Sequence, residues 1–206
     1  MSRPSAAMYD WAMARADTHH LGKWRRELLT ELTGDVVEIG AGTGVNLLHY
    51  GEGVQRLVLF EPNSSMRRRA EERVERSGRP HTEVLEGSAE ALAVEDESVD
   101  AVVSILVLCS VSDQAIALGE VWRVLRPGGQ LVFLEHVAAP EGSTALRWQQ
   151  RIDHVWPRVA LNCHTTRRTD TAIEDAGFEF ERLVSESLDT SPPWIRPAVR
   201  GVAIRR

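Results

Sequence analysis

The chain has 206 residues, of which 43% are apolar and 26% charged, a balance that indicates a folded globular protein and excludes a charge-rich disordered one. Its net charge of -6, without any basic run interleaved with aromatic residues, argues against a nucleic-acid partner. Residues 1–17 lack a signal-peptide pattern, and no apolar run approaches the about 20 residues that span a bilayer, so we expect no membrane partner.

Residues 1–33 are predicted to be helical, because the apolar residues between Trp24 and Leu32 fall on one face before Gly34 ends the pattern. From Asp35 onward, short β-branched runs alternate with amphipathic helices, which predicts a parallel sheet with helices on both faces. The predicted strands are 36–39, 56–60, 82–85, 99–104 and 130–135, and then 178–184 and 198–204 as a terminal hairpin at the sheet edge.

A helix predicted over 113–125 carries an apolar stripe and is stopped by the sequence Arg126-Pro127-Gly128-Gly129. Proline cannot continue a helix, and glycine permits the reversal of the chain. The stretch 139–169 is the least regular part of the sequence, and we place substrate selection there.

A glycine-rich turn follows the first predicted strand and precedes a helix, the position at which doubly wound folds bind their ligands. Its glycines are Gly40, Gly42 and Gly44. A dinucleotide site would place the third glycine at position 45, which is Val45, so the spacing disfavours an NAD-dependent oxidoreductase. A tight turn without any ligand is the other interpretation of this motif.

Glu61 ends the second predicted strand, where a carboxylate can accept hydrogen bonds from both hydroxyls of an adenosine ribose. The alternative is a charge that merely flanks a helix start. Pro62 and Asn63 already supply the turn and the N-cap of the next helix, so the ribose role is favoured.

Three further segments end at the same predicted sheet edge. The loop at Ser88 offers a hydroxyl and backbone groups to an adenine edge. The apolar run 104–110 either walls a dry pocket or belongs to the core. His136 ends the fifth strand and either takes a proton from a nucleophile or is an ordinary structural histidine.

The two cysteines, Cys109 and Cys163, lie far apart in the chain and form no disulfide framework, which fits a reducing cytoplasm. Together with His154 and His164 they lack the spacing of a structural zinc site. We therefore expect no metal.

Several ordered motifs resemble those of class I S-adenosylmethionine-dependent methyltransferases: Glu38 to Gly44, Glu61, Gly87-Ser88-Ala89-Glu90, Asp100 and Arg126-Pro127-Gly128-Gly129. The resemblance implies a Rossmann-like α/β fold with a seven-stranded, mostly parallel sheet. It also implies that the three glycines surround the methionine half of S-adenosylmethionine, that Glu61 binds its ribose, and that Ser88 and Ala89 lie at its adenine. Ser88 stands where an aspartate is common in that class.

Four further stretches resemble the methyltransferase-like seven group, which methylates thiols: Leu106 to Val111, Glu135-His136-Val137, Trp148-Gln149-Gln150 and Asn162 to Arg167. A small-molecule thiol is therefore the favoured acceptor. Its unperturbed pKa of about 8.5 supplies some thiolate at neutral pH, so it demands less of a base than an alcohol or phenol. The alternatives are O- or C-methylation of a secondary metabolite or quinone, and an inactive protein that only binds an adenosine ligand.

We accordingly expect a single domain over 1–206, with a helical lid at 1–33, a cofactor-binding core at 34–139, and a substrate-selecting segment with the terminal hairpin at 140–206. The candidate cofactor residues are Glu38, Gly40, Ala41, Gly42, Gly44, Glu61, Pro62, Ser88, Ala89, Glu90, Ile105 and Leu106. The candidate pocket residues are Tyr9, Trp11, Cys109, Trp148, Gln149 and Trp156, with His136 as the catalytic candidate. The oligomeric state is not predicted.

Overall fold

The computed structural model describes residues 21–189 and 191–206. Its centre is one seven-stranded sheet in the order β3-β2-β1-β4-β5-β7-β6. The strands are β1 (Gly34–Ile39), β2 (Val54–Phe60), β3 (Thr82–Leu85), β4 (Val99–Ile105), β5 (Leu125–His136), β6 (Glu179–Ser187) and β7 (Pro197–Ile204). The first five strands are parallel, and β7 runs antiparallel to both of its neighbours, β5 and β6. This confirms the mostly parallel sheet with a C-terminal antiparallel hairpin.

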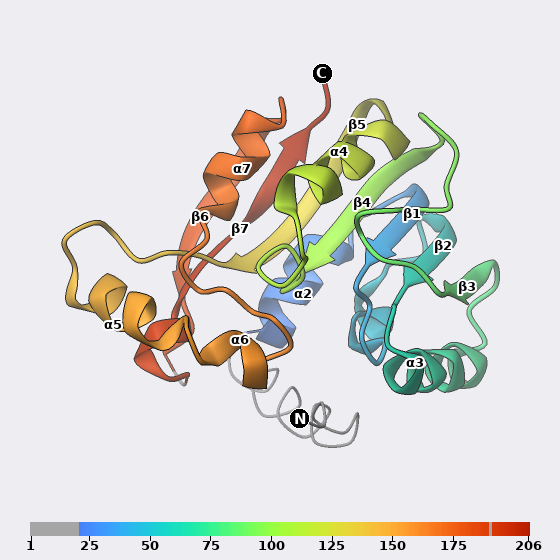
Figure 1. Cartoon of the computed structure of the whole chain (residues 1–206). Coiled ribbons are helices and arrows are strands. Elements are labelled where there is room, and N and C mark those ends of the chain that lie inside the picture. Colours follow the sequence, from blue (N-terminus) through green and yellow to red (C-terminus); the bar gives the residue numbers. More distant parts are fainter. Residues whose placement is uncertain (1–20, 190) are drawn as a thin grey trace.

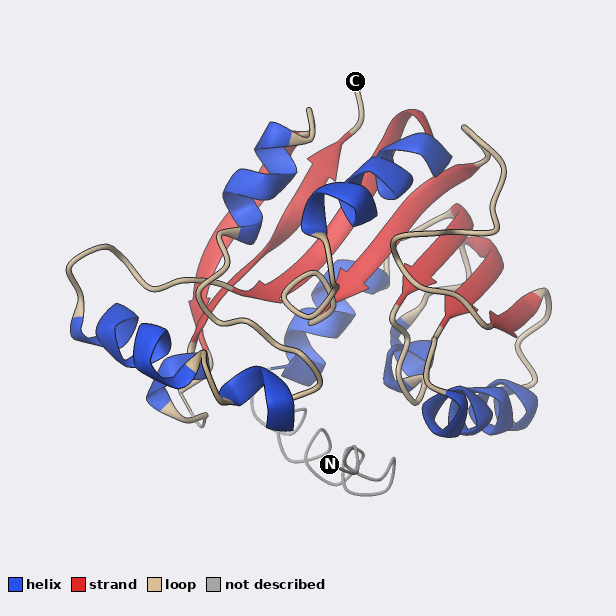
Figure 2. Cartoon of the chain, in the orientation of Figure 1, coloured by secondary structure: helices blue, strands red, loops and turns tan. Residues whose placement is uncertain are grey.

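Helices cover both faces of the sheet (Figures 1 and 2). They are α2 (Gly22–Leu29), α3 (Ser64–Ser77), α4 (Gln114–Val124), α5 (Thr144–Ile152), α6 (Trp156–Val159) and α7 (Thr169–Asp175), with short 3-10 turns η2 (Val45–His49) and η3 (Pro193–Ile195). Figure 1 shows α4 and α7 in front of the sheet, α2 behind it, and α5 and α6 beyond the carboxyl end of β5. Among the described residues, no helix is long and apolar enough to cross a membrane.

The two faces of the sheet form two separate cores, because successive side chains of a strand point to opposite sides. Val37 of β1 packs on the α4 and α7 side together with Leu118 and Ile173. Its neighbour Val36 packs on the other side with Leu28 of α2 and Leu47. Helix α2 therefore belongs to the core of the protein. Residues 1–20, which make up most of the expected lid, lie outside the described residues.

The turn at 126–129 differs from the prediction in one respect. Helix α4 does end at Val124, before the proline, but β5 starts at once at Leu125 instead of after the glycines. Residue Val99 of β4 pairs with Leu125 and Ala101 pairs with Gln130, so the four residues between them form a bulge in an otherwise continuous strand. The bulge is held by Arg126, which forms ion pairs with Asp35 and Asp100.

Candidate active site

The glycine loop runs from the carboxyl end of β1 into η2. Gly40, Gly42 and Gly44 all have positive φ, at 57°, 60° and 79°, a conformation that costs little only for glycine. A Cβ on Gly40 would lie 2.7 Å from both γ-methyl groups of Val107, in the loop that follows β4. Glycine is therefore needed at this position both for its backbone angle and for the close approach of the two loops.

Glu61 joins the ends of β1 and β2. Its carboxylate accepts a hydrogen bond from the Gly42 backbone N–H at 2.8 Å and another from the Asn63 N–H at 2.7 Å. The side chain is 5% exposed, while the neighbouring Pro62 is exposed. Asn63 caps α3 by accepting from the N–H groups of Ser65 and Met66, which confirms the predicted cap. Glu61 is thus held beside the glycine loop and is not required as a cap.

Glu38 lies buried beneath the same loop and is 1% exposed. Its carboxylate accepts hydrogen bonds from the Asn46 amide at 2.7 Å and the Tyr50 hydroxyl at 2.6 Å. Arg25 of α2 donates in turn to the Asn46 side-chain oxygen. Burial raises the pKa of Glu38 to about 7, against the smaller opposing effects of the two hydrogen bonds. Glu38 therefore meets protein donors on both of its oxygens and supports the loop from below.

No local sequence pattern predicts Asn46, Tyr50 or Arg25 as parts of this network. The same holds for Arg73 of α3, which donates to the backbone oxygen and the hydroxyl of Thr43 in the glycine loop. Arg73 lies 30 positions from Thr43, and nothing in the local pattern of α3 distinguishes it from the neighbouring arginines.

The loop after β3 contains the three expected adenine-side residues. Ser88 and Ala91 form a small bridge, and Ala89 is buried in the core on the α4 side. The Glu90 carboxylate accepts from the Ser112 backbone N–H at 2.7 Å. This loop is therefore tied to the chain after β4, at the same sheet edge as Glu61.

The loop after β4 is organised by Glu135, which is fully buried. One carboxylate oxygen accepts from the Ser104 hydroxyl at 2.7 Å and from the N–H groups of Val107 and Leu108, each at 3.0 Å. The other accepts from the Cys109 N–H at 3.1 Å. Ile105 ends β4, and Leu106 begins this loop at a φ of 60°. Three backbone hydrogen bonds from the loop and one from Ser104 of β4 thus hold the loop that faces the glycines on one carboxylate.

His136 follows Glu135 on β5 and therefore points to the opposite face of the sheet. It is 8% exposed, and its Nδ1 atom is buried without a hydrogen-bond partner. Burial lowers the pKa of His136 to about 4, so the imidazole is neutral at physiological pH.

The candidate pocket residues are spread over different environments. Cys109 is buried in the loop after β4. Gln149 is also buried, and its amide bonds the backbone of Ala139, Val137 and Trp194, which ties α5 to the end of β5. Trp148 is half exposed and lies under Arg151, whereas Trp156 packs edge-on against Trp194 at 5.9 Å between ring centroids. Tyr9 and Trp11 lie outside the described residues.

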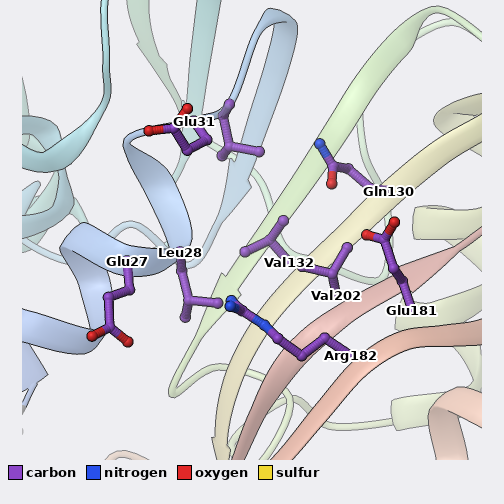
Figure 3. Close-up of a pocket in the computed structure, with 9 residues that line it drawn as sticks. Glu27, Leu28, Glu31, Gln130, Val132, Glu181, Arg182 and Val202 are labelled. Atoms are coloured by element: carbon purple, nitrogen blue, oxygen red, sulfur yellow. The ribbon is translucent and has the colours of Figure 1, made fainter.

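A cavity of about 440 Å³ lies elsewhere, between α2 and the sheet (Figure 3). Gln130 and Val132, in the middle of β5, line it together with Leu28 and Val202. It lies on the far side of β5 from the glycine loop and is not the candidate active site. In the described part of the chain, no three His, Cys, Asp or Glu side chains are grouped so that they could hold a metal ion.

The strand order, the glycine loop and the carboxylate at the end of β2 define a class I methyltransferase fold. Solved structures with this fold cover nearly the whole chain. Geranyl diphosphate methyltransferase in complex with SAM matches with a TM-score of 0.74 at 17% identity, over 94% of this chain and 85% of that one. A SAM-dependent methyltransferase from Thermotoga maritima, described as a possible histamine N-methyltransferase, matches at 0.68 and 21% identity, over 97% and 96%.

Sequence similarity narrows the assignment. Residues 37–133 match the family model described as a methyltransferase domain. The chain is 36% identical to human thiol S-methyltransferase TMT1A, over 82% of this chain and 70% of that protein. It is 33% identical to human thiol S-methyltransferase TMT1B, over 88% and 78%. The chain belongs to the family of S-adenosylmethionine-dependent methyltransferases that contains these two proteins, and it is an enzyme of that class.

Proposed function

We propose that the protein transfers the methyl group of S-adenosylmethionine to a small-molecule thiol, in the cytoplasm and without a metal. The observation that carries the proposal is the junction of the glycine loop with Glu61, where the Gly42 N–H and the Glu61 carboxylate are 2.8 Å apart at the carboxyl edge of the sheet. The relatives named thiol S-methyltransferases support sulfur as the acceptor.

The residues at this edge suit the cofactor. At Gly40, Gly42 and Gly44 the loop has no side chain, which allows close approach of its backbone to a ligand. Glu61 presents a buried carboxylate, whose oxygens have lone pairs for the two hydroxyls of a ribose. In our proposal Pro62 lies beside the ribose, Ser88, Ala89 and Glu90 face the adenine, and Ala41, Ile105 and Leu106 border the rest of the ligand. When bound, the cofactor supplies a methyl group on a sulfonium.

The protein's contribution is mainly alignment. An in-line displacement depends on the positions of the nucleophile, the carbon and the leaving group, and misplacement by about 1 Å can cost on the order of 100-fold in rate. Glu135 fixes the loop after β4 through three backbone hydrogen bonds. The apolar side chains of that loop, with Cys109, would keep water from the reacting atoms. Trp148, Gln149 and Trp156, with Tyr9 and Trp11, remain our candidates for the surroundings of the acceptor.

His136 remains our candidate for the group that receives the acceptor's proton. Its lowered pKa of about 4 keeps the imidazole unprotonated, and therefore able to accept, over the whole physiological range. The same low pKa makes it a weak base. It would suit a thiol, which ionises readily, better than an alcohol or phenol.

The test is methyl transfer from labelled S-adenosylmethionine to matched panels of small thiols, phenols and quinols. We expect transfer to thiols alone. Transfer only to phenols or quinols would agree with a methyltransferase but refute a thiol as its acceptor. No transfer to any acceptor, with cofactor binding retained, would favour a binding protein without activity.

Two variants separate cofactor binding from acceptor chemistry. Glu61→Ala removes hydrogen bonds from a charged group worth about 1.5–3 kcal/mol each, so we expect the Kd for S-adenosylmethionine to rise roughly 100-fold. Glu83→Ala, which removes an exposed carboxylate paired with Arg56, is the matched control and should leave that Kd unchanged. His136→Ala should lower turnover and alter its pH profile; an unchanged profile would exclude His136 as the proton acceptor.

A further inference from the structure

The two cysteines of the chain come from separate segments, yet their sulfur atoms lie 3.7 Å apart. Cys109 belongs to the loop after β4, and Cys163 to the segment between α6 and α7. They are 1% and 7% exposed, and both are free thiols. The methyl transfer proposed above assigns no chemistry to either sulfur, so the pair requires its own explanation.

The backbones on both sides of the pair are already bonded to each other. The His164 N–H donates to the Cys109 carbonyl at 2.8 Å, and the Asn162 amide donates to the Ser110 carbonyl at 2.8 Å. Arg167 spans the loop, with one guanidinium nitrogen on the Leu108 carbonyl and the other on the Val111 carbonyl, each at 2.8 Å. The sulfur atoms of a disulfide are about 2.05 Å apart, so these two must still approach each other by about 1.7 Å. Side-chain rotation can supply this movement while the two backbone segments stay in place.

The two thiols differ in reactivity. The hydrogen bond with Cys163 and then burial raise the pKa of Cys109 well above its ordinary value, and the nearby Glu135 carboxylate adds to the effect. The pKa of Cys163 is lowered, chiefly by its hydrogen bond with Cys109. Cys163 is also the more exposed residue of the two, at 7% against 1%. It is therefore the one to react first as a nucleophile, with Cys109 as its resolving partner.

We propose that Cys109 and Cys163 form an oxidisable dithiol site that reacts with a peroxide and closes to a disulfide between the loop after β4 and the segment before α7. The Cys163 thiolate attacks the peroxide, forming an S–O bond, breaking the O–O bond and releasing one water after protonation. Cys109 loses its proton and attacks the Cys163 sulfur, forming the S–S bond and breaking the S–O bond to release a second water. The two thiols lose two electrons and hydrogen peroxide gains them.

The disulfide would act on the methyltransferase site through the loop that holds Cys109. That loop contains Val107, which contacts the glycine loop closely enough to exclude a Cβ at Gly40. It also contains Leu106 at positive φ. A disulfide at Cys109 would therefore shift the loop that borders the cofactor site. We expect methyl transfer to slow at least several-fold on oxidation.

The decisive measurement is a non-reducing peptide map of the full chain after treatment with hydrogen peroxide. We expect one linked peptide pair containing Cys109 and Cys163 within single chains, the loss of two hydrogens in the intact mass, and reversal by a phosphine. A phosphine is used because a thiol reductant is itself a candidate acceptor of the methyl group. Two cysteines that remain free after peroxide treatment, or that link different chains, would overturn the proposal.

A variant tests the effect on activity. Cys163→Ser cannot form the bond, so it should keep its methyl-transfer rate after peroxide under conditions in which the wild type loses most of its rate. Cys163 is substituted because it lies outside the proposed pocket wall and is the more exposed residue of the two. If Cys163→Ser loses activity as fast as the wild type, the disulfide does not control the site. The peptide map needs no variant and decides the chemical proposal even if the acceptor is not a thiol.

Discussion

The Glu135 carboxylate is the best place to test the loop geometry, because three backbone N–H donors of the loop after β4 and the Ser104 hydroxyl of β4 converge on it. In Glu135→Gln, the amide oxygen can still accept from the Ser104 hydroxyl and from the N–H groups of Val107 and Leu108. The new amide NH2 then faces the Cys109 N–H, which leaves two buried donors without an acceptor. At about 1–2 kcal/mol each, the free energy of unfolding should fall by about 2–4 kcal/mol.

For a chain of this length, 1 kcal/mol moves the Tm by about 2–4 °C, so the variant should melt roughly 5–15 °C below the wild type. Thermal and urea unfolding followed by circular dichroism measure the loss directly. Glu83→Gln is the control, because this exposed carboxylate pairs with Arg56 in solvent and its loss should change stability by less than about 1 kcal/mol. A Glu135→Gln variant as stable as Glu83→Gln would refute the assignment of Glu135 as the anchor of the loop.

Three other predictions concern the glycine loop and its support. Gly40→Ala should destabilise the protein by more than Gly78→Ala and weaken cofactor binding, because both residues have positive φ but only Gly40 faces a neighbour, Val107 at 2.7 Å; equal melting temperatures would contradict this. Glu38 has a folded pKa of about 7 against an ordinary 4.5, so its contribution to stability is present below pH 4.5 and lost as pH rises through 7. The difference in unfolding free energy between the wild type and Glu38→Gln should therefore fall by roughly 3 kcal/mol over that range in urea titrations, whereas a constant difference would place the Glu38 pKa near its ordinary value. Arg73→Gln should remove the contacts to Thr43 and raise the cofactor Kd, while Arg76→Gln, on the exposed side of α3, should not.

Much of the sheet could be predicted because its strands are short apolar runs bounded by strong turn signals. The bulge at 126–129 could not, since the same proline and glycines that end a helix also fit inside a strand when Arg126 has acidic partners from β4 and β1. Those partners are distant in sequence, and no local pattern reveals them.

The candidate site shows the same division. The positions of the glycine loop and of Glu61 could be predicted from motif spacing, because each directly follows the end of a strand. The network around Glu38 and the loop anchored by Glu135 were not. Each depends on which side of a strand a buried carboxylate faces and on donors brought there by other elements, and those are properties of the packed structure.

The position of β7 between β5 and β6 affects how the chain folds. β7 pairs with β5 on one side and with β6 on the other, and β5 and β6 do not pair with each other. Until residues 197–204 are in place, two strands that run in the same direction therefore have open edges, and Val199 and Ala203 are missing from the core. Open edges of this kind invite pairing with other chains. The last strand thus closes the fold, and we expect truncation before Pro197 to yield aggregates instead of a smaller active enzyme.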